Sequence, residues 1–119
     1  MGSNAPYVRF LHPHTEKVQP TDARPLPTII QLANKASSIC HRQGWKRDWR
    51  HGGVHLHLEV SEFIEALRGK GGELPEQEAA DVLFVLLSML QGNNIDPNRV
   101  LRILDAKCAE ILSGERTFQ

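Results

Sequence analysis

Two pairs of acidic residues stand out because the members of each pair are about one helical turn apart. Glu59 and Glu62 form the first pair, and Glu78 and Asp81 form the second. Side chains three residues apart lie on the same face of a helix, so each pair points in one direction. Four converging carboxylates suit Mg²⁺, with Mn²⁺ as the alternative, because both cations prefer oxygen ligands. Such metals bind polyphosphates and activate water for attack on phosphorus.

The elements that must position these residues follow from the prolines and glycines. Five of the seven prolines fall within the first 27 residues, which predicts an extended N-terminal arm at 1–27. In the domain at 28–119, glycine clusters alternate with glycine-free intervals of helical length. We therefore predict an all-α fold, a four-helix bundle preceded by the arm. The predicted helices span 28–43, 54–68, 75–91 and 97–113, the last capped by Asp96.

Helical winding separates the three glutamates of the second predicted helix. An apolar stripe on this helix is expected to face the core, and Glu59 and Glu62 flank the stripe, whereas Glu65 falls on the solvent side. The stripe consists of Leu56, Val60, Phe63 and Leu67. Glu65 is therefore excluded from the predicted site.

The second acidic pair leads directly into the run 82–90, which is apolar on nearly every side of its helix. A helix of this kind needs protein around it. Glu78 and Asp81 share an angular sector with Val85, so they should point toward the same neighbours. The connection at 69–72 is short and glycine-rich, which predicts that the two carboxylate helices pack antiparallel and bring the acidic pairs face to face.

The two motifs resemble a known family. The segments LEVSEFIEA at 58–66 and EAADVLF at 78–84 are similar to the ExxE and ExxD signature of the MazG-like all-α nucleoside triphosphate pyrophosphatases. The resemblance spans Ile29 to Leu112. It implies hydrolysis of a nucleoside triphosphate between the α and β phosphates, giving a nucleoside monophosphate and pyrophosphate. It also implies a house-cleaning role in the nucleotide pool, with deoxynucleotides favoured by analogy.

The same resemblance implies roles for particular residues. Mg²⁺ would be coordinated by the four carboxylates Glu59, Glu62, Glu78 and Asp81, which are the catalytic candidates. Glu62 is the candidate for orienting or deprotonating the attacking water.

One position departs from the family pattern. Many relatives carry an asparagine four residues after a lysine in the last helix, and here Lys107 is followed by Ile111. Lys107 is a candidate phosphate contact, and an exposed surface lysine is the alternative.

Further candidate substrate contacts precede the first acidic pair. Relatives often place an aromatic residue that flanks the base in this segment, so Trp45 and Trp49 are candidates for stacking on a nucleobase, with packing against the bundle as the alternative. Lys46 is a candidate phosphate donor. His55 lies one turn before Glu59 and is a candidate contact of either the substrate or a metal ligand.

Composition limits the partners and the location. Lys and Arg balance Asp and Glu at 14 each, so no net field attracts nucleic acid or an anionic membrane. No apolar run reaches the ~20 residues of a membrane span, and the N-terminus lacks a secretory pattern, so we expect a soluble cytoplasmic protein. Cys40 and Cys108 lie in apolar helical patterns and are predicted to be buried free thiols.

The apolar third helix also predicts self-association, because three short companions cannot surround it. The resemblance implies a homodimer or homotetramer. One rival interpretation is a ferritin-like di-iron protein, which needs Glu-x-x-His pairs where this chain has Glu-x-x-Glu and Glu-x-x-Asp. Another is a non-catalytic helical oligomer that acts as a binding or regulatory module, which the departure at Ile111 favours.

Overall fold

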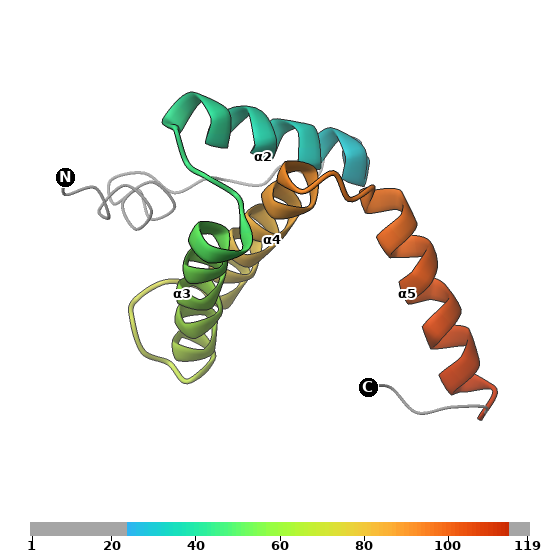
Figure 1. Ribbon diagram of the computed structural model, residues 1–119. Coiled ribbons are helices and arrows are strands. Elements are labelled where there is room, and N and C mark those ends of the chain that lie inside the picture. Colours follow the sequence, from blue (N-terminus) through green and yellow to red (C-terminus); the bar gives the residue numbers. More distant parts are fainter. Residues whose placement is uncertain (1–23, 115–119) are drawn as a thin grey trace.

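The protein is seen in a computed structural model that describes residues 24–114, a range with four α-helices and no strand (Figure 1). The helices are α2 (Ile29–Gln43), α3 (Trp49–Leu67), α4 (Pro75–Gly92) and α5 (Pro97–Leu112). The prediction of an all-α, four-helix fold is confirmed. Most of the predicted arm, residues 1–23, lies outside the described range. None of the described helices is long and apolar enough to cross a membrane.

The helix ends follow capping residues. Thr28 begins α2 with a reciprocal capping box: its Oγ1 accepts from the Gln31 backbone N–H at 3.1 Å, and Gln31 Oε1 accepts from the Thr28 N–H at 2.9 Å. The residue after α2 is Gly44, whose φ of 75° lies in the left-handed region. Asp96 caps α5, as predicted, by accepting from the Asn98 N–H at 2.9 Å.

The second helix begins five residues earlier than predicted, because Asp48 caps it. The Asp48 carboxylate accepts from the His51 backbone N–H at 2.8 Å. The glycine pair at 52–53 therefore lies inside α3 and does not break it. A Cβ at Gly52 would lie 2.8 Å from Cγ of Met89, so this glycine allows α3 and α4 to approach closely.

An antiparallel hairpin of α3 and α4 forms the centre of the fold (Figure 1). The turn between them contains three glycines with positive φ, Gly69, Gly71 and Gly72. The short glycine-rich connection thus has the predicted effect, because it reverses the chain and places the two carboxylate helices side by side.

The apolar core of the described residues lies where α2 packs across α4. Ala33 and Ala36 of α2 meet Leu87 of α4, and three larger side chains pack at the edge of this cluster, Ile29, Phe84 and Leu90. α5 contacts α2 and α4, and its remaining length extends away from the hairpin (Figure 1). α4 is therefore the helix that the other three share.

The prediction that the apolar stripe of α3 faces the core holds only in part for the single chain. Leu56 and Phe63 are partly buried, whereas Val60 and Leu67 are 37% and 60% exposed. The buried positions of α3 are instead Gly52, His55, Glu59 and Ala66. This flank packs against α4 because its glycine and alanine permit a close approach that the bulky stripe does not.

Candidate metal centre

Three of the four predicted carboxylates come together between α3 and α4. Glu59 of α3 and Glu78 and Asp81 of α4 each offer one oxygen, and these oxygens lie within 4.8 Å of one another. Glu59 is 0% exposed and Glu78 is 2% exposed, while Asp81 is partly buried. The one-turn spacing within α4 and the antiparallel hairpin together produce this convergence.

The other two acidic residues of α3 lie elsewhere. Glu62, one turn beyond Glu59, is partly buried and falls outside the group of three. Glu65 lies at the surface and forms an ion pair with Arg68 at 3.1 Å. Glu65 therefore lies outside the group of three carboxylates.

The donor set fits a hard divalent cation. Carboxylates at this separation repel one another, and burial removes the water that would screen them. Within residues 24–114, the gathered ligands are all oxygens, with neither histidine nor cysteine among them. Oxygen-only sets favour Mg²⁺ or Mn²⁺ over zinc.

A buried histidine lies directly beside the cluster. The Nε2 atom of His55 is 3.4 Å from Oε2 of Glu59, and both side chains are fully buried. On the other side of the ring, the Arg47 guanidinium lies 3.3 Å from His55 Nδ1. The same guanidinium nitrogen donates to the Ser88 hydroxyl at 3.2 Å, and Ser88 donates to the Val85 carbonyl at 2.8 Å. Ser88 is thus a buried hydroxyl that both donates and accepts a hydrogen bond.

Burial of Arg47 is the feature that sequence reasoning missed. The run WKRDWR resembles an exposed basic loop, and nothing in its spacing distinguishes one cation from the others. In the structure Arg47 is buried and Lys46 is exposed. The Arg47 charge also lies near Cys40, where burial raises the pKa of the thiol and Arg47 and Ser88 offset part of the effect.

The two tryptophans have different surroundings. Trp45 is buried and meets His55 edge to face, with ring centroids 5.8 Å apart. Trp49, the first residue of α3, is 74% exposed, and the Arg50 guanidinium lies 4.9 Å above its ring centroid. Lys107 lies partly buried on α5.

Comparison with known proteins connects these residues to a family. Residues 55–108 match the family model described as phosphoribosyl-ATP pyrophosphohydrolase. The match includes all three clustered carboxylates and the histidine beside them. No curated protein and no solved structure matches at a significant level. The matched family is described as a pyrophosphohydrolase. It belongs to the MazG-like superfamily, whose signature the acidic pairs resemble. Residues 55–108 are therefore similar to the MazG-like all-α nucleoside triphosphate pyrophosphohydrolase superfamily, in agreement with the resemblance of the two acidic motifs.

Proposed function

We propose that this protein is a Mg²⁺-dependent nucleoside triphosphate pyrophosphohydrolase that cleaves its substrate between the α and β phosphates. The products are a nucleoside monophosphate and pyrophosphate, and deoxynucleotides are the proposed preferred substrates, in a house-cleaning role. The observation that carries the proposal is the group of three carboxylates, Glu59, Glu78 and Asp81, within 4.8 Å in the α3–α4 hairpin. The family match across the same residues supports it.

The carboxylates have two tasks in this proposal. Glu59, Glu78 and Asp81 hold the metal, and Glu62, one turn from Glu59, either completes the ligand set or accepts a proton from the attacking water. When bound, Mg²⁺ supplies charge neutralisation of the triphosphate and lowers the pKa of water at the site. The buried ligands keep their oxygens in place, because the packed helices restrict their rotamers.

Substrate contacts are proposed from the surface around the hairpin. The exposed indole of Trp49 can stack on a base, and the exposed Lys46 can reach a phosphate. Trp45 would need to leave its contact with His55 in order to stack on a base. Lys107 of α5 remains a proposed contact for a phosphate of the substrate. Because His55 is fully buried beside Glu59, we expect it to contact this metal ligand rather than the substrate.

Phosphoribosyl-ATP is the second candidate substrate, because the matched family is described by that activity. This compound carries the same triphosphate as ordinary nucleotides. It also has a phosphoribosyl group, which places a further phosphate on the base side of the molecule. Its recognition would need a further cationic contact near the base. Lys46 and Arg50, exposed beside Trp49, are the residues for that role.

The decisive experiment measures product release with Mg²⁺ from each common ribonucleotide and deoxynucleotide triphosphate and from phosphoribosyl-ATP. We expect pyrophosphate as the first product from at least one substrate. Glu59→Gln and Asp81→Asn should lower kcat/KM by at least about 100-fold, because losing a metal ligand exceeds the 10–100-fold typical of residues that only support one.

The matched control is Glu65→Gln, which removes a carboxylate from the same helix outside the group of three. It should leave kcat/KM nearly unchanged. Orthophosphate as the first product would contradict the proposed bond cleavage. Absence of turnover with every substrate would favour the non-catalytic binding module. The ratio of kcat/KM values for phosphoribosyl-ATP and the best nucleotide decides between the two substrate classes.

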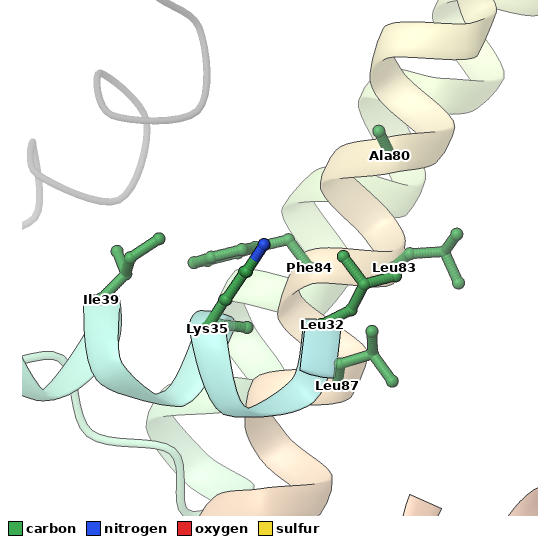
Figure 2. A pocket seen from close by; sticks show the side chains of 8 residues that line it. Leu32, Lys35, Ile39, Ala80, Leu83, Phe84 and Leu87 are labelled. Atoms are coloured by element: carbon green, nitrogen blue, oxygen red, sulfur yellow. The ribbon is translucent and has the colours of Figure 1, made fainter. Parts of the chain in front are cut away.

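Self-association into a homodimer or homotetramer is part of the proposal. Large apolar side chains are exposed on α4, where Leu83 is 56% and Leu86 is 40% exposed. An apolar groove runs between α2 and α4, lined by residues that include Leu32, Leu83 and Phe84 (Figure 2). Apolar surface of this kind next to a small core supports association with a second copy of the chain.

A further inference from the structure

A buried line of polar side chains connects the end of α4 to the carboxylate group. It begins at Ser88 of α4, continues through Arg47 of the α2–α3 loop and His55 of α3, and ends at Glu59. The successive distances are 3.2, 3.3 and 3.4 Å. All four side chains are buried. Three separate segments of the chain thus contribute to a line that ends at one carboxylate.

The chemistry of Arg47 determines where His55 carries its proton. A guanidinium has five N–H donors and no acceptor. The ring nitrogen that faces Arg47, Nδ1, must therefore act as the acceptor of their contact at 3.3 Å. The ring proton then resides on Nε2, the nitrogen that faces Oε2 of Glu59 at 3.4 Å. The protonated nitrogen lies on the carboxylate side of the ring, because Arg47 occupies the opposite side.

Arg47 is itself held by the end of α4. Its backbone carbonyl accepts from Asn93 Nδ2 at 2.8 Å, and its side chain donates to Ser88. A Cβ at Gly92 would lie 2.5 Å from Cβ of Arg47, so the absence of a side chain at Gly92 makes room for the arginine. Contacts with both its backbone and its side chain therefore restrict the position of the guanidinium.

We propose that Arg47 and His55 are positioning residues that select one carboxylate orientation of Glu59 for metal binding. This inference rests on the proposed metal site. Arg47 sets the Nε2–H tautomer of His55, and His55 restrains Oε2 of Glu59, which leaves the other oxygen, Oε1, available to the cation. Neither residue touches substrate in this arrangement. A metal ligand that is oriented in advance loses less rotamer freedom when the cation binds.

The tautomer can be measured directly in the wild-type protein. Long-range ¹H–¹⁵N spectra of protein labelled with ¹⁵N-histidine distinguish a protonated ring nitrogen from an unprotonated one. His55 is assigned by the signals that disappear in His55→Gln. We expect Nε2 protonated and Nδ1 unprotonated in wild type, and a mixture of tautomers in Arg47→Met, which removes the donor. An Nδ1–H tautomer in wild type would overturn the inference, and this readout requires no metal and no activity.

Metal binding provides the second readout, by following the electron paramagnetic resonance signal of free Mn²⁺ during titration. His55→Leu should weaken Mn²⁺ binding by about 10- to 100-fold. His55→Gln should restore most of the affinity, because the glutamine amide places an N–H donor near the position of Nε2. The matched control is His57→Leu, which changes an exposed histidine of the same helix and should leave the affinity unchanged. Circular dichroism confirms that each variant is folded.

The outcomes separate this inference from the metal site on which it rests. Equal Mn²⁺ affinity in wild type, His55→Leu and His55→Gln would overturn the positioning role and leave the carboxylate site intact. Equal loss in His55→Leu and His55→Gln would also overturn it, because packing rather than the donor would then matter. Failure of wild type to bind Mn²⁺ would overturn the proposed site itself, whatever tautomer the spectra show.

Discussion

Burial distinguishes residues of the same type that lie close together in the sequence. Glu59 and Glu65 belong to one helix, yet Glu59 is fully enclosed between α3 and α4 and Glu65 pairs with Arg68 at the surface. The two cysteines show the same contrast. Both were predicted to be buried, which is right for Cys40 and wrong for Cys108. Cys108 is exposed because the part of α5 that carries it has no helix of the described chain packed over it.

The two thiols are therefore expected to react at different rates. In the native protein at neutral pH, Cys108 should react rapidly with an aromatic disulfide reagent, and Cys40 should react only when the chain unfolds. Burial excludes the reagent from Cys40 and raises the pKa of its thiol, which lowers the fraction of reactive thiolate. The measurement is the number of fast-reacting thiols per chain. Cys108→Ser should abolish the fast phase; a fast phase in that variant would contradict the assignment.

Close helix contacts explain why two glycines that both lie within helices have different roles. Gly92, the last residue of α4, lies against Arg47, whereas a Cβ at Gly53 of α3 would meet no atom within 4 Å. The helix ends depend on particular side chains in the same way, because Asp48 extends α3 through the segment that contains Gly53.

Replacing these two glycines by alanine should have opposite effects. Gly92→Ala should destabilise the protein by about 1–3 kcal/mol, because the new Cβ would overlap Cβ of Arg47. Gly53→Ala should stabilise it by about 0.5–1 kcal/mol, since alanine loses less conformational freedom in a helix. Chemical denaturation measures both. A destabilisation of the same size in the two variants would contradict the proposed packing of Arg47 against α4.

Asp48 should make the stability of the protein depend on acidic pH. The backbone and side-chain hydrogen bonds from His51 hold the pKa of Asp48 below its usual value. A lowered folded pKa means that the stabilisation is complete above the pKa of the unfolded chain and is lost as the pH falls through the folded pKa. Thermal unfolding should show Asp48→Ala less stable than wild type near neutral pH, with the difference shrinking on acidification.

Asp48→Asn is the control for this effect. Asparagine keeps the oxygen that accepts from the helix N–H but does not titrate. It should retain more stability than the alanine variant at neutral pH and lack the acid-dependent part of the difference. A difference between wild type and Asp48→Ala that stays constant down to about pH 3 would contradict the role of the charged cap.

At the scale of the whole molecule, the described chain leaves apolar side chains of two helices uncovered. Val60 and Leu67 of α3 and Leu83 and Leu86 of α4 are all exposed by 37% or more. The chain buries the carboxylate flank of α3 and leaves Val60 and Leu67 of its apolar stripe exposed. This distribution is expected of a subunit whose core is completed by a partner.

Light scattering at micromolar concentration should therefore give the mass of a dimer or tetramer. Leu83→Glu should shift the population toward smaller species, because the charge enters the apolar groove between α2 and α4. Leu112→Glu changes an exposed leucine outside the groove and serves as the comparison. A monodisperse wild-type monomer would contradict self-association.

Much of the helical arrangement could be predicted because its signals are local. Thr28 and Asp96 cap helices through hydrogen bonds to residues two or three positions away, and the glycines after α3 reverse the chain through their own φ angles. The start of α3 was missed for a different reason. Gly52 resembles a helix breaker until Met89, 37 residues later in the chain, is known to lie against it.

The sequence by itself predicted that the protein is all-α and that two acidic pairs on neighbouring antiparallel helices face each other, because one-turn spacing and a short glycine turn are sufficient for both. Of the four predicted carboxylates, Glu59, Glu78 and Asp81 lie together and Glu62 lies outside the group. The tertiary structure alone decided which face of α3 is buried and that Arg47 turns inward beneath the end of α4. Those outcomes depend on contacts between residues distant in the chain, where a glycine or alanine on one helix sets how closely another approaches. Periodicity identifies the faces of a helix, but packing selects the face that is covered.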